Sequence, residues 1–440
     1  MHRTGVPPPE LTLLSAVALV VGQVIAVGIF LTPGTLIRTV ASPFWILVVW
    51  IVIGAMAVSG AVCYGALAAR YPQSGGGYVY LRETYGPGVA FVYGWKCLLV
   101  MDPGVTAALA TGFASYVSYI APLGNAARRG VAIAAILGLA LVHVAGVRPG
   151  ARLLTGLSVT KIVLILGLVV AAFGSASGTW ANASPFFERH ALNPPLLGGL
   201  AGGLVAAFFS FGGWWEVTKI AGEVHDAPRT VRRALLIGLV VITALYIAAT
   251  LAFVYVIPIE AVRPGEAFVA QVGEAVFGQA GASAVAVVVL VCVLGSLGTI
   301  LMLAPRVYWA MARDGLFPAA AAELSPRFGT PARAILIQAA LASILVALGT
   351  FDTIVAYFVF VTVAFIMLTV AGVYRLRGRD PGFRVPGSPW SPLVFLTVGA
   401  VLLTLLALNN PLQAALGTAI VAAGVPVYRR ISAIQRAPLR

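Results

Sequence analysis

Lys161 lies in the middle of an apolar stretch, residues 153–173, that is long enough to form a membrane-spanning helix. The chain has 28 basic residues, of which only three are lysines: Lys96, Lys161 and Lys219. A charge near a bilayer centre costs about 2.5–3.5 kcal/mol on insertion scales, and such a residue usually faces the bundle interior on an ion or substrate path. The alternative is a structural lysine that extends to an interface or donates to a carbonyl of a neighbouring helix. We predict a coupling or gating role.

Two carboxylates also fall within apolar runs. Asp102 precedes Pro103 in the third run, where it either takes part in function or bonds a hydroxyl at a kink. Glu216 follows a glycine pair in the sixth run, where it could carry a coupling proton, bind a substrate amine, pair with a lysine or serve a structural role. Both are candidate coupling or gating residues.

Motifs for other chemistry are missing from the sequence. The four histidines have no metal-ligand spacing, and there is no paired His/Glu metal motif, nucleophile elbow or phosphate loop. The sequence therefore predicts no enzyme, no metal and no cofactor. The cysteines, Cys63, Cys97 and Cys292, lie in or beside apolar runs and are expected to be small core residues.

The composition is that of a polytopic membrane protein. Of the 440 residues, 60% are hydrophobic and only 10% are charged, whereas soluble domains carry about 25% charged residues. The net charge of +14 could suggest a nucleic-acid partner, but the charges cluster between apolar runs, so the lipid bilayer is the expected partner.

The apolar runs predict an all-α fold of about twelve membrane-spanning helices, which puts both chain ends on one side. The runs cover residues 11–34, 44–69, 88–119, 130–147, 152–174, 198–221, 232–257, 280–304, 332–349, 353–374, 391–408 and 411–427.

Charge asymmetry predicts the orientation. When loops are assigned alternately, 22 basic residues fall on the side of the termini, Lys96 and Lys219 among them, against five on the other side. The positive-inside rule then places both termini in the cytoplasm of a multi-pass protein in the cell's inner (plasma) membrane.

Two spans carry helix-weakening residues in corresponding positions. The first run contains Gly22, Gly28, Pro33 and Gly34, and the sixth contains a Gly-Gly pair followed by Trp-Trp-Glu, residues 212–216. Paired interruptions indicate a transporter's binding site. A broken helix frees N–H groups that suit a carboxylate and C=O groups that suit an ammonium group, so the two breaks together fit a zwitterion. The alternative is that small residues merely allow close helix packing.

Motifs spread along nearly the whole chain resemble the amino acid–polyamine–organocation superfamily, and most closely its L-type amino acid transporter branch. The matching segments, in chain order, are VIAVGIF at 24–30, YPQSGGGYVY at 71–80 with YGP at 85–87, FSFGGW at 209–214, Glu223 with Pro228 and Arg232, ARDGLFP at 312–318, and FRVP at 383–386.

The resemblance implies a leucine-transporter-like fold with an inverted five-plus-five repeat. Residues 1–174 would form the first repeat with helix one broken, residues 198–374 the second with helix six broken, and residues 391–440 two added helices and a cytoplasmic tail.

The resemblance also implies a substrate site between helices one and six. Backbone N–H groups of Ala26, Val27 and Gly28 would hold the α-carboxylate of an amino acid. Carbonyls of Val24, Phe209 and Gly212 would take its α-ammonium. Phe209 would be an aromatic gate, and Lys161 would stand where sodium sits in sodium-coupled relatives. From the residues themselves, Gly213 and Trp214 are added to the candidate substrate-binding set. Trp214 and Trp215 either shape the pocket or pack as membrane tryptophans commonly do near an interface.

Some positions depart from the family pattern. Ala26 and Val27 replace a glycine and a small polar residue, so a hydroxyl contact to substrate is lost, while backbone binding can survive. The loop between the third and fourth helices lacks the cysteine with which animal relatives link a single-span partner, so no disulfide-linked heavy subunit is expected.

The resulting expectation is a sodium-independent secondary transporter or exchanger of neutral L-amino acids that works by alternating access. The main alternative is a polyamine or cationic amino acid carrier, with proton coupling, that uses Glu216 and Asp102 as cation sites. A membrane amino acid sensor is a further alternative. Lys161 would act as a fixed tether to freed carbonyls of the first helix or as a titrating group, and we favour the tether.

Overall fold

The computed structural model describes residues 11–40, 42–186, 194–262, 268–349 and 351–436. Within these ranges the chain is helical, with a single isolated β-bridge between Leu11 and Val224. Among the described residues, ten helices are long and apolar enough to cross a membrane. The predicted all-α, polytopic membrane fold is therefore confirmed.

Each of the twelve predicted runs corresponds to one helix or to one interrupted helix. The first is α1 (Leu13–Val24) with α2 (Val27–Val40), and the sixth is α9 (Pro194–Phe211) with the 3₁₀ helix η3 (Trp214–Glu223). The others are α3 (Pro43–Arg70), α5 (Pro87–Lys96) with the π-helix η1 (Cys97–Met101) and α6 (Asp102–Ile120), α7 (Asn125–Val144), α8 (Val147–Phe173), α10 (Ala227–Val256), α12 (Gln279–Leu303) with α13 (Pro305–Arg313), α14 (Ala332–Leu348), α15 (Phe351–Arg379), α16 (Trp390–Asn409) and α17 (Pro411–Arg436).

Short helices occupy the connections. They are α4 (Gly77–Tyr85), η2 (Trp180–Ala183), η4 (Ile259–Ala261), α11 (Phe268–Phe277) and η5 (Ala319–Ala321). The division into two inverted repeats, with its boundaries, stays a prediction. Of the arginines used to predict orientation, Arg3, Arg189, Arg263 and Arg440 lie outside the described residues.

Helix one is interrupted at Ile25 and Ala26, between α1 and α2. The interruption does not fall on Gly22 or Gly28, which both lie within helical turns. These glycines serve close packing: a Cβ on Gly22 would meet Ser158 Oγ at 2.2 Å, and one on Gly28 would meet Ser210 Cα at 2.6 Å. The sequence thus predicted the break, but the packing explanation holds for these two glycines.

Helix six is interrupted at the predicted glycine pair. Gly212 donates its N–H to Phe209 O at 3.0 Å, and Gly213 has φ +101°, a left-handed conformation that glycine adopts without a Cβ clash. Glu216 N then donates to Gly213 O at 3.0 Å, which starts η3. Gly213 therefore redirects the chain from α9 into a narrower helix.

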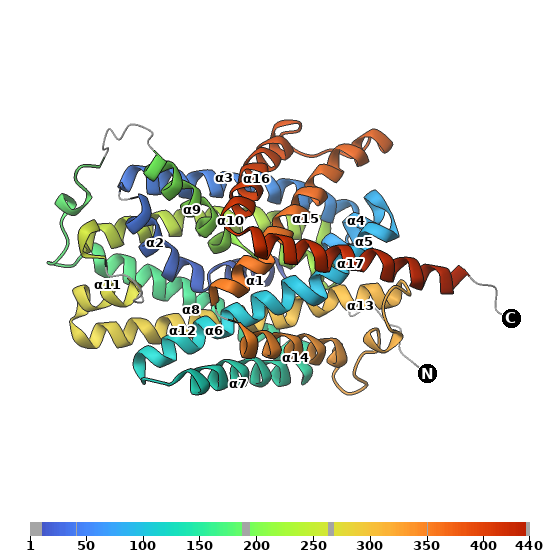
Figure 1. The fold of residues 1–440 in the computed structure, drawn as a ribbon, viewed down its shortest axis with the longest axis horizontal. Helices are drawn as coiled ribbons and strands as arrows, with labels where there is room; N and C mark the ends of the chain where they lie inside the picture. The colour runs from blue at the N-terminus through green and yellow to red at the C-terminus, as the bar shows by residue number, and fades with distance from the viewer. Residues whose placement is uncertain (1–10, 41, 187–193, 263–267, 350, 437–440) are drawn as a thin grey trace.

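The two broken helices lie at the centre of the bundle. In Figure 1 most helices run along the long axis, with α1 in the middle, α3 and α16 toward the top, and α7 and α14 along the lower edge. α1 packs against α8, α10 and α12, while α2 packs against α9. Thr32 of α2 shares a 2.6 Å hydrogen bond with Ser210 of α9, which joins the second half of helix one to the first half of helix six.

The periphery presents apolar side chains outward. Leu141 on α7, Leu408 on α16 and Leu412 on α17 are each more than 60% exposed. Such a surface is stable against lipid and unfavourable in water. These helices therefore form the bilayer-facing layer around the broken pair.

The contact between α2 and α9 gives a stability prediction. A Cβ on Gly199 would lie 2.2 Å from the backbone oxygen of Thr39, an atom that cannot move without shifting α2. We expect Gly199→Ala to destabilise the protein by about 1–3 kcal/mol, as overpacking does, and to lower its unfolding temperature in detergent. Gly202→Ala, three residues along the same helix with nothing within 4 Å, is the control. Equal unfolding temperatures for the two variants would contradict this account of the contact.

Candidate substrate site

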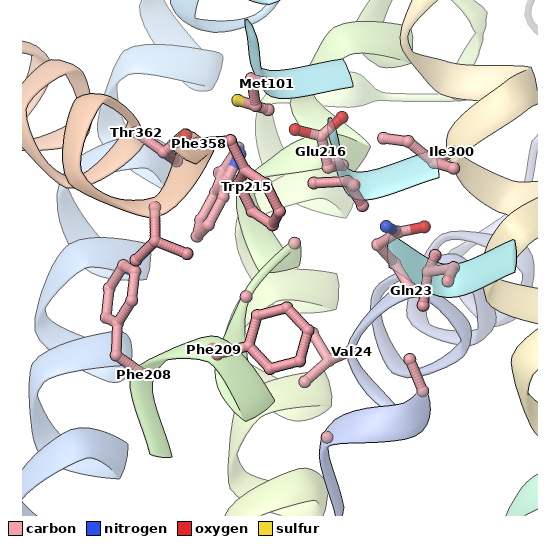
Figure 2. Close-up of a pocket in the computed structure, with 17 residues that line it drawn as sticks. Gln23, Val24, Met101, Phe208, Phe209, Trp215, Glu216, Ile300, Phe358 and Thr362 are labelled. Atoms are coloured by element: carbon pink, nitrogen blue, oxygen red, sulfur yellow. The ribbon is translucent and has the colours of Figure 1, made fainter. Parts of the chain in front are cut away.

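A cavity lies between the two helix breaks (Figure 2). Its walls come from α1, α2, η1, α6, α9, η3, α12 and α15, together with the residues of both interruptions. Most of the predicted substrate-binding residues line it: Val24, Ala26, Gly28, Phe209, Gly212 and Gly213. Glu216, predicted as a coupling residue, also lines the cavity.

The helix ends around the cavity offer opposite partial charges. α1 ends and α2 begins at the first break, so carbonyl groups and N–H groups without intrahelical partners occur close together there. α9 ends at the second break and adds further carbonyls. The positive end of α2 and the negative ends of α1 and α9 thus face one space, as a zwitterion requires.

Some of the predicted carbonyl acceptors already have protein partners. Tyr246 donates its hydroxyl to Val24 O and to Ser210 O, both at 3.0 Å. Phe209 O accepts the Gly212 N–H. A carbonyl has two lone pairs, so each can still accept from a ligand. Tyr246, which sequence reasoning missed, joins the two broken helices through their backbones.

Phe209 is partly buried, and its ring centroid lies 6.4 Å from that of Phe358 on α15. Figure 2 draws Phe209 and Val24 in the lower half of the cavity and Phe358 above them. An aromatic pair between helix six and α15 can close one side of a cavity to water.

Lys161 does not line the cavity but lies fully buried behind the first break. Its ammonium donates to Gly22 O at 2.7 Å, to Ile25 O at 2.9 Å and to Ser296 Oγ at 2.8 Å. Ser296 in turn donates toward the same two carbonyls. Three elements, α1, α8 and α12, therefore meet at one ammonium group.

Asp102 also lies outside the cavity, in a buried ion cluster. Lys219 Nζ is 3.1 Å from Asp102 Oδ1 and 2.7 Å from Glu216 Oε2, and Tyr308 donates its hydroxyl to Asp102 Oδ2 at 2.8 Å. Asp102 thus bonds a hydroxyl at a kink, and Glu216 pairs with a lysine, which were both among the predicted alternatives. The π-helix η1 ends directly before Asp102, and such bulges are frequent at functional sites.

Lys96 and Lys219 correct the charge count used for orientation. They were counted as loop cations, but each is only 1% exposed. Lys96 Nζ lies 4.7 Å from the ring centroid of Tyr93 and 2.8 Å from Met101 Sδ. Lys219 lies near the end of the sixth apolar run and Lys96 in the first third of the third run, where a sequence does not distinguish a snorkelling side chain from one that turns inward. All three lysines of the chain are therefore buried.

Trp214 and Val27 also differ from the expectation. Trp214 is buried but does not line the cavity, and its ring packs against Tyr64 with centroids 5.2 Å apart. Of the two tryptophans considered for the pocket, Trp215 is the one that lines the cavity. Val27 begins α2, and its side chain lies outside the described residues.

Sequence reasoning missed several lining residues, including Gln23, Met101, Phe358 and Thr362. Gln23 carries a recognisable signal, because it is an amide in an otherwise apolar run. Met101 and Phe358 carry none, since each is an apolar residue in an apolar helix.

Charged groups at the ends of the bundle form further pairs. Arg306 Nε lies 3.1 Å from Glu223 Oε1 in a buried pair that links α13 to η3. Asp314 pairs with Arg82 and accepts the Tyr78 hydroxyl at 2.7 Å. Burial, followed by that hydrogen bond, raises the pKa of the Tyr78 phenol well above its ordinary value. These contacts hold α4 and η3 against α13.

The described residues include no group of three or more His, Cys, Asp and Glu side chains that could hold a metal ion.

Comparison with known proteins agrees with the architecture. Residues 11–427 match the model of the amino acid permease family. The chain is 27% identical to the serine/threonine exchanger SteT of Bacillus subtilis (strain 168), over 95% of this chain and 96% of that protein. It is 28% identical to the large neutral amino acids transporter small subunit 2 of Mus musculus, over 95% of this chain and 80% of that protein. It is 26% identical to the Asc-type amino acid transporter 1 of Homo sapiens, over 95% and 81% respectively.

The resemblance inferred from the motifs is thereby confirmed over nearly the whole length of the chain. The cavity at two broken helices, the apolar outer layer and the family match describe one kind of molecule: the chain belongs to the amino acid permease family of the amino acid–polyamine–organocation superfamily.

Proposed function

We propose that this protein is a sodium-independent exchanger of neutral L-amino acids that works by alternating access in the cell's inner (plasma) membrane, with both termini in the cytoplasm. Family membership supports amino acid transport. The names of two relatives, a serine/threonine exchanger and a transporter of large neutral amino acids, support exchange and neutral substrates. The burial of all three cysteines supports an active form without a disulfide-linked partner.

The observation that carries sodium independence is the environment of Lys161. Its ammonium is surrounded by two carbonyl oxygens and a hydroxyl, which are the hard oxygen ligands that a sodium ion would need. A second unit charge 4 Å away would be repelled by about 4 kcal/mol at an effective dielectric constant of 20. The lysine therefore supplies the positive charge that a coupling cation would supply elsewhere.

Substrate recognition follows from the two breaks. Ala26, which directly precedes α2, and the first two residues of α2, Val27 and Gly28, would offer N–H groups to the α-carboxylate. Val24, Phe209 and Gly212 line the same cavity, and their carbonyls would accept from the α-ammonium. Both charged ends of an amino acid are then bound by backbone, which leaves side chains to select among substrates.

The cationic carrier alternative requires Glu216 and Asp102 to be available for a ligand's charge. Both carboxylates are already shared by Lys219, at 2.7 and 3.1 Å. A cationic substrate would have to compete with a buried protein cation. This arrangement favours neutral substrates.

Transport in proteoliposomes tests the proposal. We expect labelled neutral amino acids to be taken up when an amino acid is present inside, at the same rate with and without a sodium gradient. Amides and deaminated acids should compete weakly, because each lacks one charged group. A sodium requirement would refute the coupling model. Equal competition by putrescine, which has no carboxylate, would support the polyamine alternative.

The gate role of Phe209 gives a second test. We predict that Phe209→Ala abolishes most of the transport while the protein still purifies as a folded monodisperse species, since the ring contributes aromatic contact and water exclusion rather than a bond. Phe277→Ala, at a half-exposed phenylalanine of α11 outside the cavity, is the control. Transport at the parental rate by the Phe209 variant would remove this residue from the gate.

The tether role of Lys161 gives a third. Hydrogen bonds to charged groups contribute about 1.5–3 kcal/mol each, so Lys161→Ala should slow transport by about tenfold or more at every pH. The carbonyls that Lys161 binds, Gly22 O and Ile25 O, lie at the end of α1, the half of helix one nearer the N-terminus. Because we place the N-terminus in the cytoplasm, substrate affinity should weaken mainly on the cytoplasmic side.

The matched control is Thr160→Ala, because Thr160 bonds only within its own helix, to Gly156 O. Side-resolved transport across a pH series distinguishes the tether from a titrating lysine. A pH-dependent rate whose inflection disappears in the Lys161 variant would assign a proton-carrying role, and unchanged kinetics on both faces would exclude both roles.

A further inference from the structure

Four side chains that line the cavity carry buried polar atoms without a hydrogen-bond partner. They are Gln23 Oε1 on α1, Trp215 Nε1 and Glu216 Oε1 on η3, and Thr362 Oγ1 on α15. The four residues are between 1% and 6% exposed, so bulk water does not reach them freely. Buried polar groups are nearly always paired, and one left unpaired loses the full free energy of its hydration. Four such atoms around one cavity indicate a polar ligand group.

We propose that Gln23, Trp215, Glu216 and Thr362 form a subsite that selects substrates whose side chain ends in a group that both donates and accepts hydrogen bonds, namely a hydroxyl or a carboxamide. This inference rests on the proposed function, because it assumes that an amino acid occupies the cavity.

Donor and acceptor types decide the chemistry. The indole N–H of Trp215 can only donate, the carboxylate of Glu216 can only accept, and the Thr362 hydroxyl can do both. An ammonium group on the substrate would leave the indole unpaired, and a carboxylate would meet Glu216. An apolar side chain would satisfy none of them. A hydroxyl or a carboxamide satisfies donor and acceptor together.

The ion cluster reduces the negative charge at the subsite. Glu216 Oε2 is in contact with Lys219 at 2.7 Å, and Lys219 also pairs with Asp102, so one ammonium is shared by two carboxylates and compensates part of the charge on Glu216. Its other oxygen, Oε1, has no hydrogen-bond partner. Lys219 is therefore a positioning residue that fixes Glu216 and reduces the attraction for a cationic side chain.

The place of the subsite fits a substrate side chain. In Figure 2, Glu216 and Thr362 lie in the upper half of the cavity, whereas Val24 and Phe209, at the breaks, lie in the lower half. An amino acid bound at the breaks by its α-groups would direct its side chain toward Glu216 and Thr362. The remaining wall there is apolar and includes Met101 and Ile300. It suits a short carbon chain that carries one polar end.

Isosteric substrate pairs test the inference. In counterflow with labelled substrate, L-threonine should compete at least about tenfold better than L-valine, and L-serine better than L-2-aminobutyrate, because each pair differs by a hydroxyl in place of a methyl group. A tenfold ratio corresponds to about 1.4 kcal/mol, the size of one net hydrogen bond. L-ornithine, whose side chain ends in an ammonium, should compete more weakly than L-threonine.

Two conservative variants assign the effect to the subsite. Trp215→Phe and Thr362→Val each remove the polar atom and keep most of the shape, so each should bring the threonine-to-valine ratio toward one. Trp50→Phe and Thr250→Val make the same changes at buried residues whose polar atoms are also unpaired but lie outside the cavity. These controls should keep the parental ratio. Ligand-induced thermal shifts of the purified proteins give the same ratio if a variant transports too slowly.

The outcomes separate this inference from the proposed function. Equal competition by threonine and valine in the parental protein, with transport intact, overturns the subsite and leaves the transporter assignment in place. A parental preference that both variants retain also overturns it, because water alone would then satisfy the four atoms. Preference for ornithine would assign Glu216 to a cation site. Failure of every amino acid to compete would refute the proposed function itself.

Discussion

The backbone groups freed at two interrupted helices must be satisfied inside a molecule that lipid surrounds. The Lys161 ammonium and the Ser296 hydroxyl cover the end of α1, and the Tyr246 hydroxyl bridges Val24 O to Ser210 O. These contacts allow an irregular backbone to persist at the centre of the bundle. The other helices enclose this irregular region, and α7 and α17 are among those exposed to lipid.

A second constraint is the burial of four charges beside the cavity. Lys96 belongs to α5, Asp102 to α6, and Glu216 and Lys219 to η3, and the formal charges of the four sum to zero. A buried ion is stable only when paired and hydrogen-bonded, and removing one member of such a pair is strongly destabilising. The cluster therefore links helix three to the second half of helix six. It also sets the charge that a ligand meets at Glu216.

Sequence reasoning predicted the helices, from the lengths of the apolar runs, and the buried ion, from the free-energy cost of a charge in such a run. The apolar runs determine the helices, and Lys161 stands out because an ion in such a run needs a compensating partner. The paired interruptions identified the cavity. Two details depended on rotation about a helix axis: whether Trp214 or Trp215 faces the cavity, and whether Lys96 and Lys219 turn inward or outward. Gly213 has a left-handed backbone conformation, and η3 is a 3₁₀ helix. The α-helical period of α9 therefore does not predict which side chains of η3 face the cavity. The exact site of the first break was equally hidden, because Ile25 and Ala26 have no helix-breaking character.

The 3₁₀ form of η3 has a geometric consequence for the pair between Glu216 and Lys219. At three residues per turn, side chains three apart stand directly above one another, whereas in an α-helix they are rotated by about 60°. The distance between the Glu216 carboxylate and the Lys219 ammonium therefore depends on the number of residues per turn in η3. Any tightening or loosening of η3 during a transport cycle would turn the ammonium away from one carboxylate, and the Asp102 contact from α6 would be the one left to hold it. A change in the pitch of η3 would therefore also change how charge is distributed beside the cavity.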